Sequence, residues 1–219
     1  MAENENIEYN GDNTAEDVLA WAIENFYPDI TVSCSFEQPV TAHMALKINP
    51  NVTIFSIDTG RLPEETYECA EEFQRKFNAN IVWFFPEREE VEKLEEEKGL
   101  FSFRESLEAR KECCGIRKVE PLNRALQGMK AWVTGRRKDQ NVTRNELPKI
   151  EYDYEHGGLL KINPLVDWTA DDVQDYIKRY DIPVNKLLKK GYTSVGCACC
   201  TRAVQPGEDS RSGRWGWEQ

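Results

Sequence analysis

Four of the seven cysteines occur in two close pairs, a spacing that suits metal chemistry. Cys113 and Cys114 are adjacent in ARKECCGIRKVEPL, and Cys197 and Cys200 form a Cys-x-x-Cys in GCACCTR. Four thiolates can hold a zinc ion or an iron–sulfur cluster. Adjacent side chains on a helix point about 100° apart, so both reach one tetrahedral ion only with strain. A cluster offers them different irons, and the spacing therefore favours a [4Fe–4S] cluster on these four cysteines over zinc.

The alternative for any cysteine is a buried structural side chain, because free cysteine is among the most buried residue types. Cys34 and Cys69, in apolar or helical surroundings, fit this alternative. Arginine and lysine residues surround the adjacent pair, and such cations lower thiol pKa values and favour thiolate ligands. The role of Cys199 has two alternatives: a spare thiol beside the cluster, or a competitor of Cys200 as ligand.

A second group of side chains is cationic. Arg136 and Arg137 directly follow the apolar run AWVTG. Further members of the group are Arg144, Arg202, Arg211 and Arg214. Arginine binds phosphate or sulfate oxygens with a planar fork of donors, although a single arginine is more commonly a solvated surface charge. Arg136 and Arg137 gain weight from their place after a predicted strand, where α/β sheets bind ligands.

Two further segments offer polar groups to a nucleotide. SCSFEQP (33–39) supplies the hydroxyls of Ser33 and Ser35, and backbone N–H groups at the start of a predicted helix, which suit an anion. It lacks the glycines that let a loop wrap a pyrophosphate, which argues against ATP cleavage. FSIDTGR (55–61) supplies Asp58 and Thr59 for a ribose or a base, although Asp-Thr-Gly also makes ordinary turns.

These segments follow short apolar runs rich in β-branched and aromatic residues, which predict strands. The strands are expected at 30–36, 51–58, 79–85 and 131–135. Helices are expected at 14–27 behind a Thr-x-x-Asp cap, 39–48, 63–78 with Pro63 in its first turn, and 87–98. The alternation predicts an α/β fold, a doubly wound and mainly parallel sheet with helices on both faces. Ligands bind beyond the carboxyl ends of such strands, so SCSFEQP, DTGR and TGRRKDQ should line one crevice.

The rest of the chain is expected to extend this domain. PKIEYDY and LLKINPL predict two short strands around a His-Gly-Gly turn, and TADDVQDYIKRY predicts a helix capped by Thr169. The run EREEVEKLEEEK, with mixed charges at helical spacing, is interpreted as a solvated helix face. The segment from about 190 to 219, dense in Gly, Cys and Arg, is expected to be irregular. Residues 1–219 are predicted to form a single domain, because no repeat or linker divides them.

Composition excludes several classes of function. The 28 basic and 39 acidic residues give a net charge of −11, which opposes the broad phosphate contact of nucleic-acid binders. No stretch approaches the roughly 18 apolar residues of a membrane span, and the acidic N-terminus does not resemble a secretory signal. Seven cysteines in a chain of this size indicate metal or redox chemistry rather than a disulfide framework. We therefore expect a cytoplasmic protein without nucleic-acid or membrane partners; its oligomeric state is not predicted.

Seven motifs together resemble the adenylyl-sulfate (APS) reductase branch of the sulfonucleotide reductase family. They are CCGIRKVEPL, GCxxCTR, IDTGRLPEETY, EKGLFSF, TGRRKDQNVTR, INPL and GEDSRSGRW. The resemblance covers nearly the whole chain from about residue 30, and the paired cysteines are its most specific part, because branches that use the 3′-phosphorylated substrate (PAPS) usually lack them. It implies an adenine-nucleotide alpha-hydrolase-like sheet carrying a [4Fe–4S] cluster. The implied reaction reduces APS to sulfite and AMP in sulfate assimilation, with thioredoxin or a glutaredoxin-like reductant as partner.

The resemblance also implies roles for individual residues. Residues expected to hold the substrate are Ser33, Ser35, Phe36, Asp58, Thr59, Gly135, Arg136, Arg137, Arg144 and Trp215. Lys118, Arg211 and Arg214 match family positions that engage the phosphosulfate. Lys118 also neighbours the cluster cysteines, so the cluster is expected to tune the electrostatics at the sulfate without changing its own redox state.

The nucleophile is expected outside these 219 residues. The family carries it as the cysteine of a Glu-Cys-Gly-Leu-His segment, which forms an S-sulfocysteine, whereas this sequence ends at RWGWEQ. We expect that segment to follow Gln219 in the full-length protein, since Cys34, Cys69 and Cys199 make unconvincing substitutes. SCSFEQP and Gly216 also depart from the family pattern, which bears on substrate preference. The alternatives are a PAPS reductase, a cluster- and nucleotide-binding homologue without the tail, and a zinc-stabilised relative with adenylyl or thiolation chemistry.

Overall fold

The computed structural model describes residues 14–140, 147–209 and 212–218. The strands are β1 (Ile30–Ser33), β2 (Thr53–Ile57), β3 (Ile81–Phe84), β4 (Ala131–Val133), β5 (Ile150–Asp153) and β6 (Leu159–Ile162). The α-helices are α1 (Ala15–Phe26), α2 (Val40–Ile48), α3 (Glu64–Phe77), α4 (Arg88–Lys98), α5 (Leu107–Cys114), α6 (Glu120–Leu126) and α7 (Ala170–Tyr180). Each predicted strand and helix therefore has a counterpart, with ends shifted by a few residues.

The six strands form one sheet in the order β3-β2-β1-β4-β6-β5. Every neighbouring pair is parallel except β5 and β6, which form an antiparallel hairpin at one edge. The chain moves outward from β1 through β2 to β3 and then returns to place β4 on the other side of β1. The order thus reverses between β1 and β4, and the expected doubly wound, mainly parallel sheet is confirmed.

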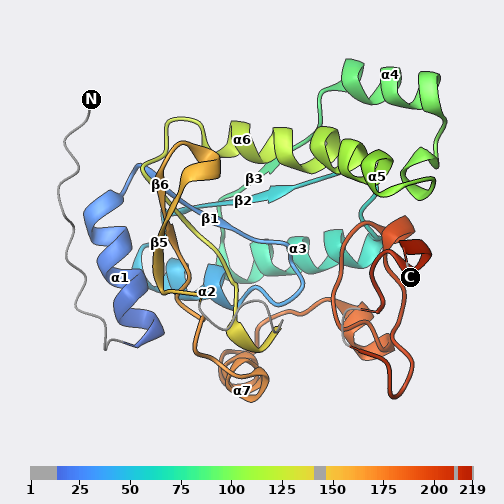
Figure 1. Ribbon diagram of the computed structural model, residues 1–219. Helices are drawn as coiled ribbons and strands as arrows, with labels where there is room; N and C mark the ends of the chain where they lie inside the picture. The colour runs from blue at the N-terminus through green and yellow to red at the C-terminus, as the bar shows by residue number, and fades with distance from the viewer. Residues whose placement is uncertain (1–13, 141–146, 210–211, 219) are drawn as a thin grey trace.

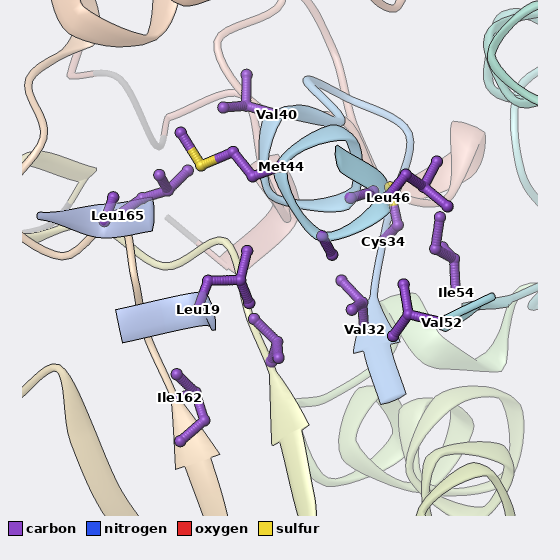
Figure 2. Packing of buried hydrophobic residues seen from close by; sticks show 14 of the residues in the cluster. Leu19, Val32, Cys34, Val40, Met44, Leu46, Val52, Ile54, Ile162 and Leu165 are labelled. Carbon is purple, nitrogen blue, oxygen red and sulfur yellow. The ribbon is translucent and has the colours of Figure 1, made fainter. Parts of the chain in front are cut away.

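Helices cover both faces of the sheet (Figure 1). Helix α6 contacts β2 and β3 on one face, whereas α1 and α2 contact β1 on the other. The larger apolar core lies on the α1–α2 side and includes Leu19, Val32, Met44 and Ile162 (Figure 2). All four are almost fully removed from water, so this core holds the carboxyl end of β1 in a fixed position.

Local sequence explains several helix ends. Thr14 and Thr169 each form a capping box, in which the threonine hydroxyl accepts from the N–H of Asp17 or Asp172 and that aspartate accepts in return. Helix α3 begins at Glu64, one residue later than expected, and Pro63 is its N-cap rather than a residue of its first turn. The acidic helix α4 buries only Leu94, which confirms a largely solvated helix face.

Three consecutive helical segments between 107 and 126 were not predicted. Helix α5 runs into a π-helical turn, Gly115–Val119, and then into α6. Gly115 and Pro121 interrupt the apolar periodicity of this stretch, but Gly115 adopts helical angles and Pro121 lies in the first turn of α6. Proline is tolerated there because the first N–H groups of a helix have no intrahelical acceptor.

The described residues after Lys190 form no α-helix or sheet strand, as expected for this segment. They make short 3₁₀ turns and an isolated antiparallel bridge between Thr201 and Arg214. Cys200 and Trp217 join Leu94, Phe103 and Cys113 in an apolar cluster, so the segment packs against α4 and α5. Within the described residues no helix combines the length and apolar character needed to cross a bilayer.

Candidate active site

A cavity of about 250 Å³ opens beyond the carboxyl ends of β1 and β2. One side is built from the loops after these strands and includes Ser33, Ser35 and Thr59. The other side is built from α5, the π-helical turn and the C-terminal segment. Three distant parts of the sequence therefore meet at the edge where a doubly wound sheet binds its ligand.

All four cysteines predicted as ligands line this cavity. Cys113 and Cys114 are the last residues of α5, and Cys197 and Cys200 bracket one 3₁₀ turn of the C-terminal segment. Cys199 lines the same wall, with its sulfur 3.8 Å from that of Cys200. The two cysteine pairs are thus brought to one place by packing of the C-terminal segment on α5.

The four thiols are donors of the kind that both iron–sulfur clusters and zinc ions use. Four thiols at one cavity wall are the ligand set that such clusters use, each binding one iron. A single zinc ion needs three or four donors around one point. In the described parts of the chain, no group of three or more His, Cys, Asp or Glu side chains is arranged to hold one metal ion.

Hydrogen bonds and cations favour a thiolate at Cys197. Its pKa is lowered to about 6, first by a hydrogen bond with Cys200 and then by one with Thr59, whose Oγ1 lies 3.2 Å from the Cys197 sulfur. The positive charges of Arg214 and Lys118 act in the same direction. The pKa of Cys200 is raised, first by its hydrogen bonds with Cys197 and Cys199 and then by burial.

For Cys113 the expected lowering of the thiol pKa is wrong. Burial raises the pKa of Cys113, and the charges of Arg61 and Arg117 oppose this effect without overcoming it. The sequence showed the neighbouring cations but not that Cys113 packs into an apolar cluster with Leu94 and Phe103. Desolvation penalises the charged thiolate and outweighs the nearby charges.

The remaining wall of the cavity is cationic and aromatic. Lys118 and Arg214 line it, as do Arg110 and Trp215. The guanidinium carbon of Arg110 lies 4.3 Å from the Trp215 ring centroid, and that of Arg214 lies 4.8 Å from it. Stacking on an aromatic face orients a guanidinium while leaving N–H donors available for an anion. The cavity therefore combines hydroxyl groups, cations and thiols within one enclosure.

Two predicted substrate residues act inside the protein. Phe36, at φ +52°, is fully buried and stacks on Trp83, with ring centroids 5.9 Å apart. Both carboxylate oxygens of Asp58 accept hydrogen bonds, from the N–H of Gly60 at 2.7 Å and from the hydroxyl of Tyr67 at 2.8 Å. Neither residue lines the cavity. They shape the two loops that carry Ser33, Ser35 and Thr59.

The segment after β4 does not line this cavity, although it was expected to share one crevice with the other two loops. Arg137 donates to Asp139 at 2.9 Å, and Arg136 lies 3.7 Å from Glu151. Gly135 faces α2, where a β-carbon would lie 3.3 Å from the Thr41 hydroxyl. Arg136 and Arg137 thus contact carboxylates of Glu151 in β5 and of Asp139 in the segment after β4. The predicted Arg144 and Arg211 lie outside the described residues.

Sequence reasoning missed a network of charges in the cavity wall, in which Arg117 is buried and Arg61 and Glu95 are half-buried. Glu95 of α4 accepts a hydrogen bond from Arg61 at 2.9 Å and forms an ion pair with Arg117. Arg117 also donates to the carbonyl oxygen of Thr59 at 2.8 Å, and the N–H of Ala198 donates to the carbonyl of Arg61 at 2.8 Å. The network ties the loop after β2 to α4, to the π-helical turn and to the C-terminal segment. Arg61 and Arg117 stand beside recognisable motifs, but no pattern distinguishes Glu95 from the other glutamates of α4.

Comparison with known proteins adds an independent line of argument. Residues 29–203 match the model of the phosphoadenosine phosphosulfate reductase domain. The chain is 49% identical to an adenosine 5′-phosphosulfate reductase of Burkholderia cepacia over 85% of its own length and 74% of the relative's. It is 46% identical to the enzyme of that name from Neisseria meningitidis serogroup B, over 85% and 76% of the two chains. The crystal structure of a phosphoadenylyl-sulfate (PAPS) reductase from Candida auris, in a phosphate complex, superposes with a TM-score of 0.74 at 30% identity, covering 88% of this chain and 91% of the other.

Proposed function

The chain belongs to the phosphoadenosine phosphosulfate reductase family, and from this membership we propose that it reduces APS to sulfite and AMP in sulfate assimilation. One observation carries the proposal: four cysteines, Lys118 and Arg214 line a single cavity at the ligand edge of the sheet. The two bacterial relatives, which are 49% and 46% identical to this chain and named adenosine 5′-phosphosulfate reductases, support APS rather than PAPS as the substrate. Cysteine thiols require a reducing compartment to remain free, and we propose the cytoplasm as the location.

The proposed cofactor is a [4Fe–4S] cluster held by Cys113, Cys114, Cys197 and Cys200. The donor chemistry of the cavity supports it, and the low pKa of Cys197 supplies one ligand in its thiolate form. When bound, the cluster supplies a compact charged group that tunes the electrostatics beside the sulfate. Metal and sulfide analysis of the purified protein is expected to find iron and acid-labile sulfide rather than zinc.

The chain's own residues bind and orient the substrate. The hydroxyls of Ser33, Ser35 and Thr59 are proposed to hold the nucleotide, while Lys118 and Arg214 neutralise the phosphosulfate. Cleavage of the bond between sulfur and the bridging oxygen leaves negative charge on AMP. Cations fixed around a closed site stabilise such charge as it develops, because they need no rearrangement during the reaction.

The nucleophile is proposed to be the cysteine thiolate of the Glu-Cys-Gly-Leu-His segment that the family resemblance implies. Its sulfur attacks the sulfur of APS, the bond to the bridging oxygen breaks, and AMP leaves with that electron pair. The resulting S-sulfocysteine is then reduced by the dithiol of thioredoxin, or of a glutaredoxin-like protein. This second step releases sulfite, restores the cysteine thiol and leaves the reductant as a disulfide.

The test uses the full-length gene product, purified without oxygen and with its iron content measured. APS and PAPS are supplied separately with reduced thioredoxin, and sulfite and AMP are quantified. We expect sulfite from APS at a kcat/KM at least about tenfold above that for PAPS, since discrimination at a polar site reaches this size readily. Absence of sulfite from protein with full iron content would reject the proposed reaction, and a preference for PAPS would reject the proposed substrate.

A further inference from the structure

The side chain of Arg214 lies over Gly196, another residue of the C-terminal segment. The segment folds back on itself, because Thr201 and Arg214 form an antiparallel bridge and the N–H of Arg202 donates to the carbonyl of Gly213 at 2.9 Å. This turn brings the guanidinium of Arg214 over Gly196. Both residues line the cavity.

The three atoms nearest to a β-carbon built at Gly196 all belong to that guanidinium. A β-carbon at Gly196 would lie 2.5 Å from Nη2, 2.6 Å from Cζ and 2.7 Å from Nη1 of Arg214. Such distances are well inside van der Waals contact, so a methyl group and the guanidinium cannot occupy their places together. Gly196 does not have a positive φ, and alanine would therefore be compatible with its backbone.

We propose that Gly196 is a positioning residue for Arg214: its missing side chain leaves the space in which the guanidinium lies against the anion site. This inference rests on the proposed function, in which Arg214 neutralises the phosphosulfate. Glycine is required at position 196 for a steric reason, because any β-carbon there would overlap the guanidinium of Arg214. A methyl group at 196 displaces the far end of a flexible side chain, so the fold is retained while the cation moves.

Gly115 provides a matched control. Like Gly196 it directly neighbours a proposed cluster ligand, Cys114, and its φ is negative, at −56°. A β-carbon there would meet no atom within 4 Å. Gly115→Ala thus changes the same kind of residue beside the same kind of ligand without touching Arg214.

The experiment compares Gly196→Ala, Gly115→Ala, Arg214→Ala and the double variant Gly196→Ala with Arg214→Ala, all in the full-length, cluster-containing protein. Iron content, the Kd for AMP by calorimetry, and kcat/KM for APS are measured. We expect Gly196→Ala to weaken AMP binding roughly tenfold, the effect of one charged hydrogen bond, with iron content unchanged. Gly115→Ala should bind AMP as the parent does.

The double variant separates positioning from a general structural role. If Gly196 acts through Arg214, adding Gly196→Ala to Arg214→Ala changes the Kd for AMP by less than about twofold, because the coupled residue is already gone. An additional tenfold loss in the double variant, parental AMP binding in Gly196→Ala, or loss of iron from Gly196→Ala would each overturn the inference. Parental AMP binding in Arg214→Ala would instead reject the proposed role of Arg214 itself, and the inference with it.

Discussion

Glu95 is the single carboxylate that the described network places between two arginines of the cavity wall. Its side chain is 27% exposed, whereas those of Arg61 and Arg117 are 17% and 7% exposed. Taking a guanidinium out of water is costly unless a partner compensates its charge. Glu95 therefore compensates the charges of two cations, Arg61 and Arg117, that line the cavity beside the thiols.

Replacing Glu95 by alanine is expected to destabilise the protein by about 2 kcal/mol. The estimate lies below the 3–5 kcal/mol or so found for broken buried pairs, because Glu95 is partly exposed. The measurement is urea unfolding at neutral pH. Glu92→Ala on the same helix is the control, since Glu92 pairs with Arg88 on the surface and such pairs contribute about 0.5 kcal/mol or less. Equal losses in the two variants would contradict a special role for Glu95.

At this scale the sequence was informative where a residue type is rare. Paired cysteines are uncommon enough to single out, and the structure brings the four predicted ligands to one cavity. Glu95 is one of many acidic residues in EREEVEKLEEEK, and only tertiary contact distinguishes it. The expected pKa of Cys113 was wrong for the same reason, because burial is a property of packing rather than of sequence neighbours.

The hairpin of β5 and β6 contains a buried carboxylate with a pH-dependent contribution to stability. Asp153 lies 2.9 Å from Nδ1 of His156 and 3.6 Å from Nζ of Lys161. Burial alone would raise the pKa of Asp153, but the close contact with His156 and the charge of Lys161 outweigh it and lower the pKa. The ionised carboxylate thus stabilises the fold above its unfolded pKa, and this contribution is lost as the pH falls through the lower folded value.

Asp153→Asn is accordingly expected to cost roughly 1–2 kcal/mol near pH 6, the size of a hydrogen bond involving a charged group. The difference from the parent should shrink as the pH falls below about 4, the ordinary range of an aspartate. Unfolding free energies from denaturant titrations at several pH values measure this. Glu155→Gln, exposed in the same hairpin, is the control. A difference that stays constant down to pH 2 would contradict the assignment.

The contact between α2 and α7 contains a buried histidine, which stabilises the fold in its neutral rather than its charged form. His43 packs against the ring of Phe77, with centroids 4.6 Å apart, and its Nδ1 lies 3.0 Å from the hydroxyl of Tyr176. Burial, with the charges of Lys47 and Lys76, lowers the pKa of His43 to about 4. The folded state therefore accepts a proton less readily than the unfolded state. Stability from neutral His43 is complete above about pH 6.5 and is lost as the pH falls toward 4.

We expect His43→Gln to lose less stability than the parent between pH 7 and pH 5. Glutamine retains a polar group for Tyr176 but has no proton to gain. The comparison uses thermal unfolding at matched ionic strength, and the observable is the pH dependence of the unfolding free energy rather than its absolute value. Parallel curves for the two proteins would show that His43 is not the group responsible.

Element prediction succeeded where an apolar period was uninterrupted. The strands and the helices α1, α3 and α7 have clear periods and caps, so their positions were predicted within a few residues. Helix α5 and the π-helical turn were missed because they bury few apolar side chains, chiefly Cys113, and contain Gly115. Functional segments often depart from ideal patterns in this way, since they carry polar and thiol groups at positions that a core would make apolar.

For the whole molecule, alternation of strands and helices predicted the type of sheet but not its strand order. The order determines which loops meet, and the segment after β4 turned toward Glu151 instead of the cavity. The C-terminal segment lines the cavity, and the prediction that Cys197 and Cys200 share one cluster with Cys113 and Cys114 had indicated this contact. A net charge of −11 coexists with a cationic cavity because Lys118 and Arg214 are gathered locally while acidic residues lie on exposed faces such as α4.

The proposed cluster would join α5 to the C-terminal segment, two parts of the chain far apart in sequence. Cys200→Ser is expected to reduce bound iron to less than about a tenth of the parental content, because a missing thiolate leaves one iron without its ligand. Cys199→Ser should retain iron, which would settle the open choice between these neighbours in favour of Cys200. Without the link, hydrogen exchange in the segment 195–209 should accelerate, since ligands that bind only the folded state suppress local opening. Retention of iron by Cys200→Ser together with loss of iron from Cys199→Ser would reverse the assignment of the ligand. Unchanged hydrogen exchange in an iron-free variant would show that packing of Cys200 and Trp217 against Phe103 holds the segment without the cluster.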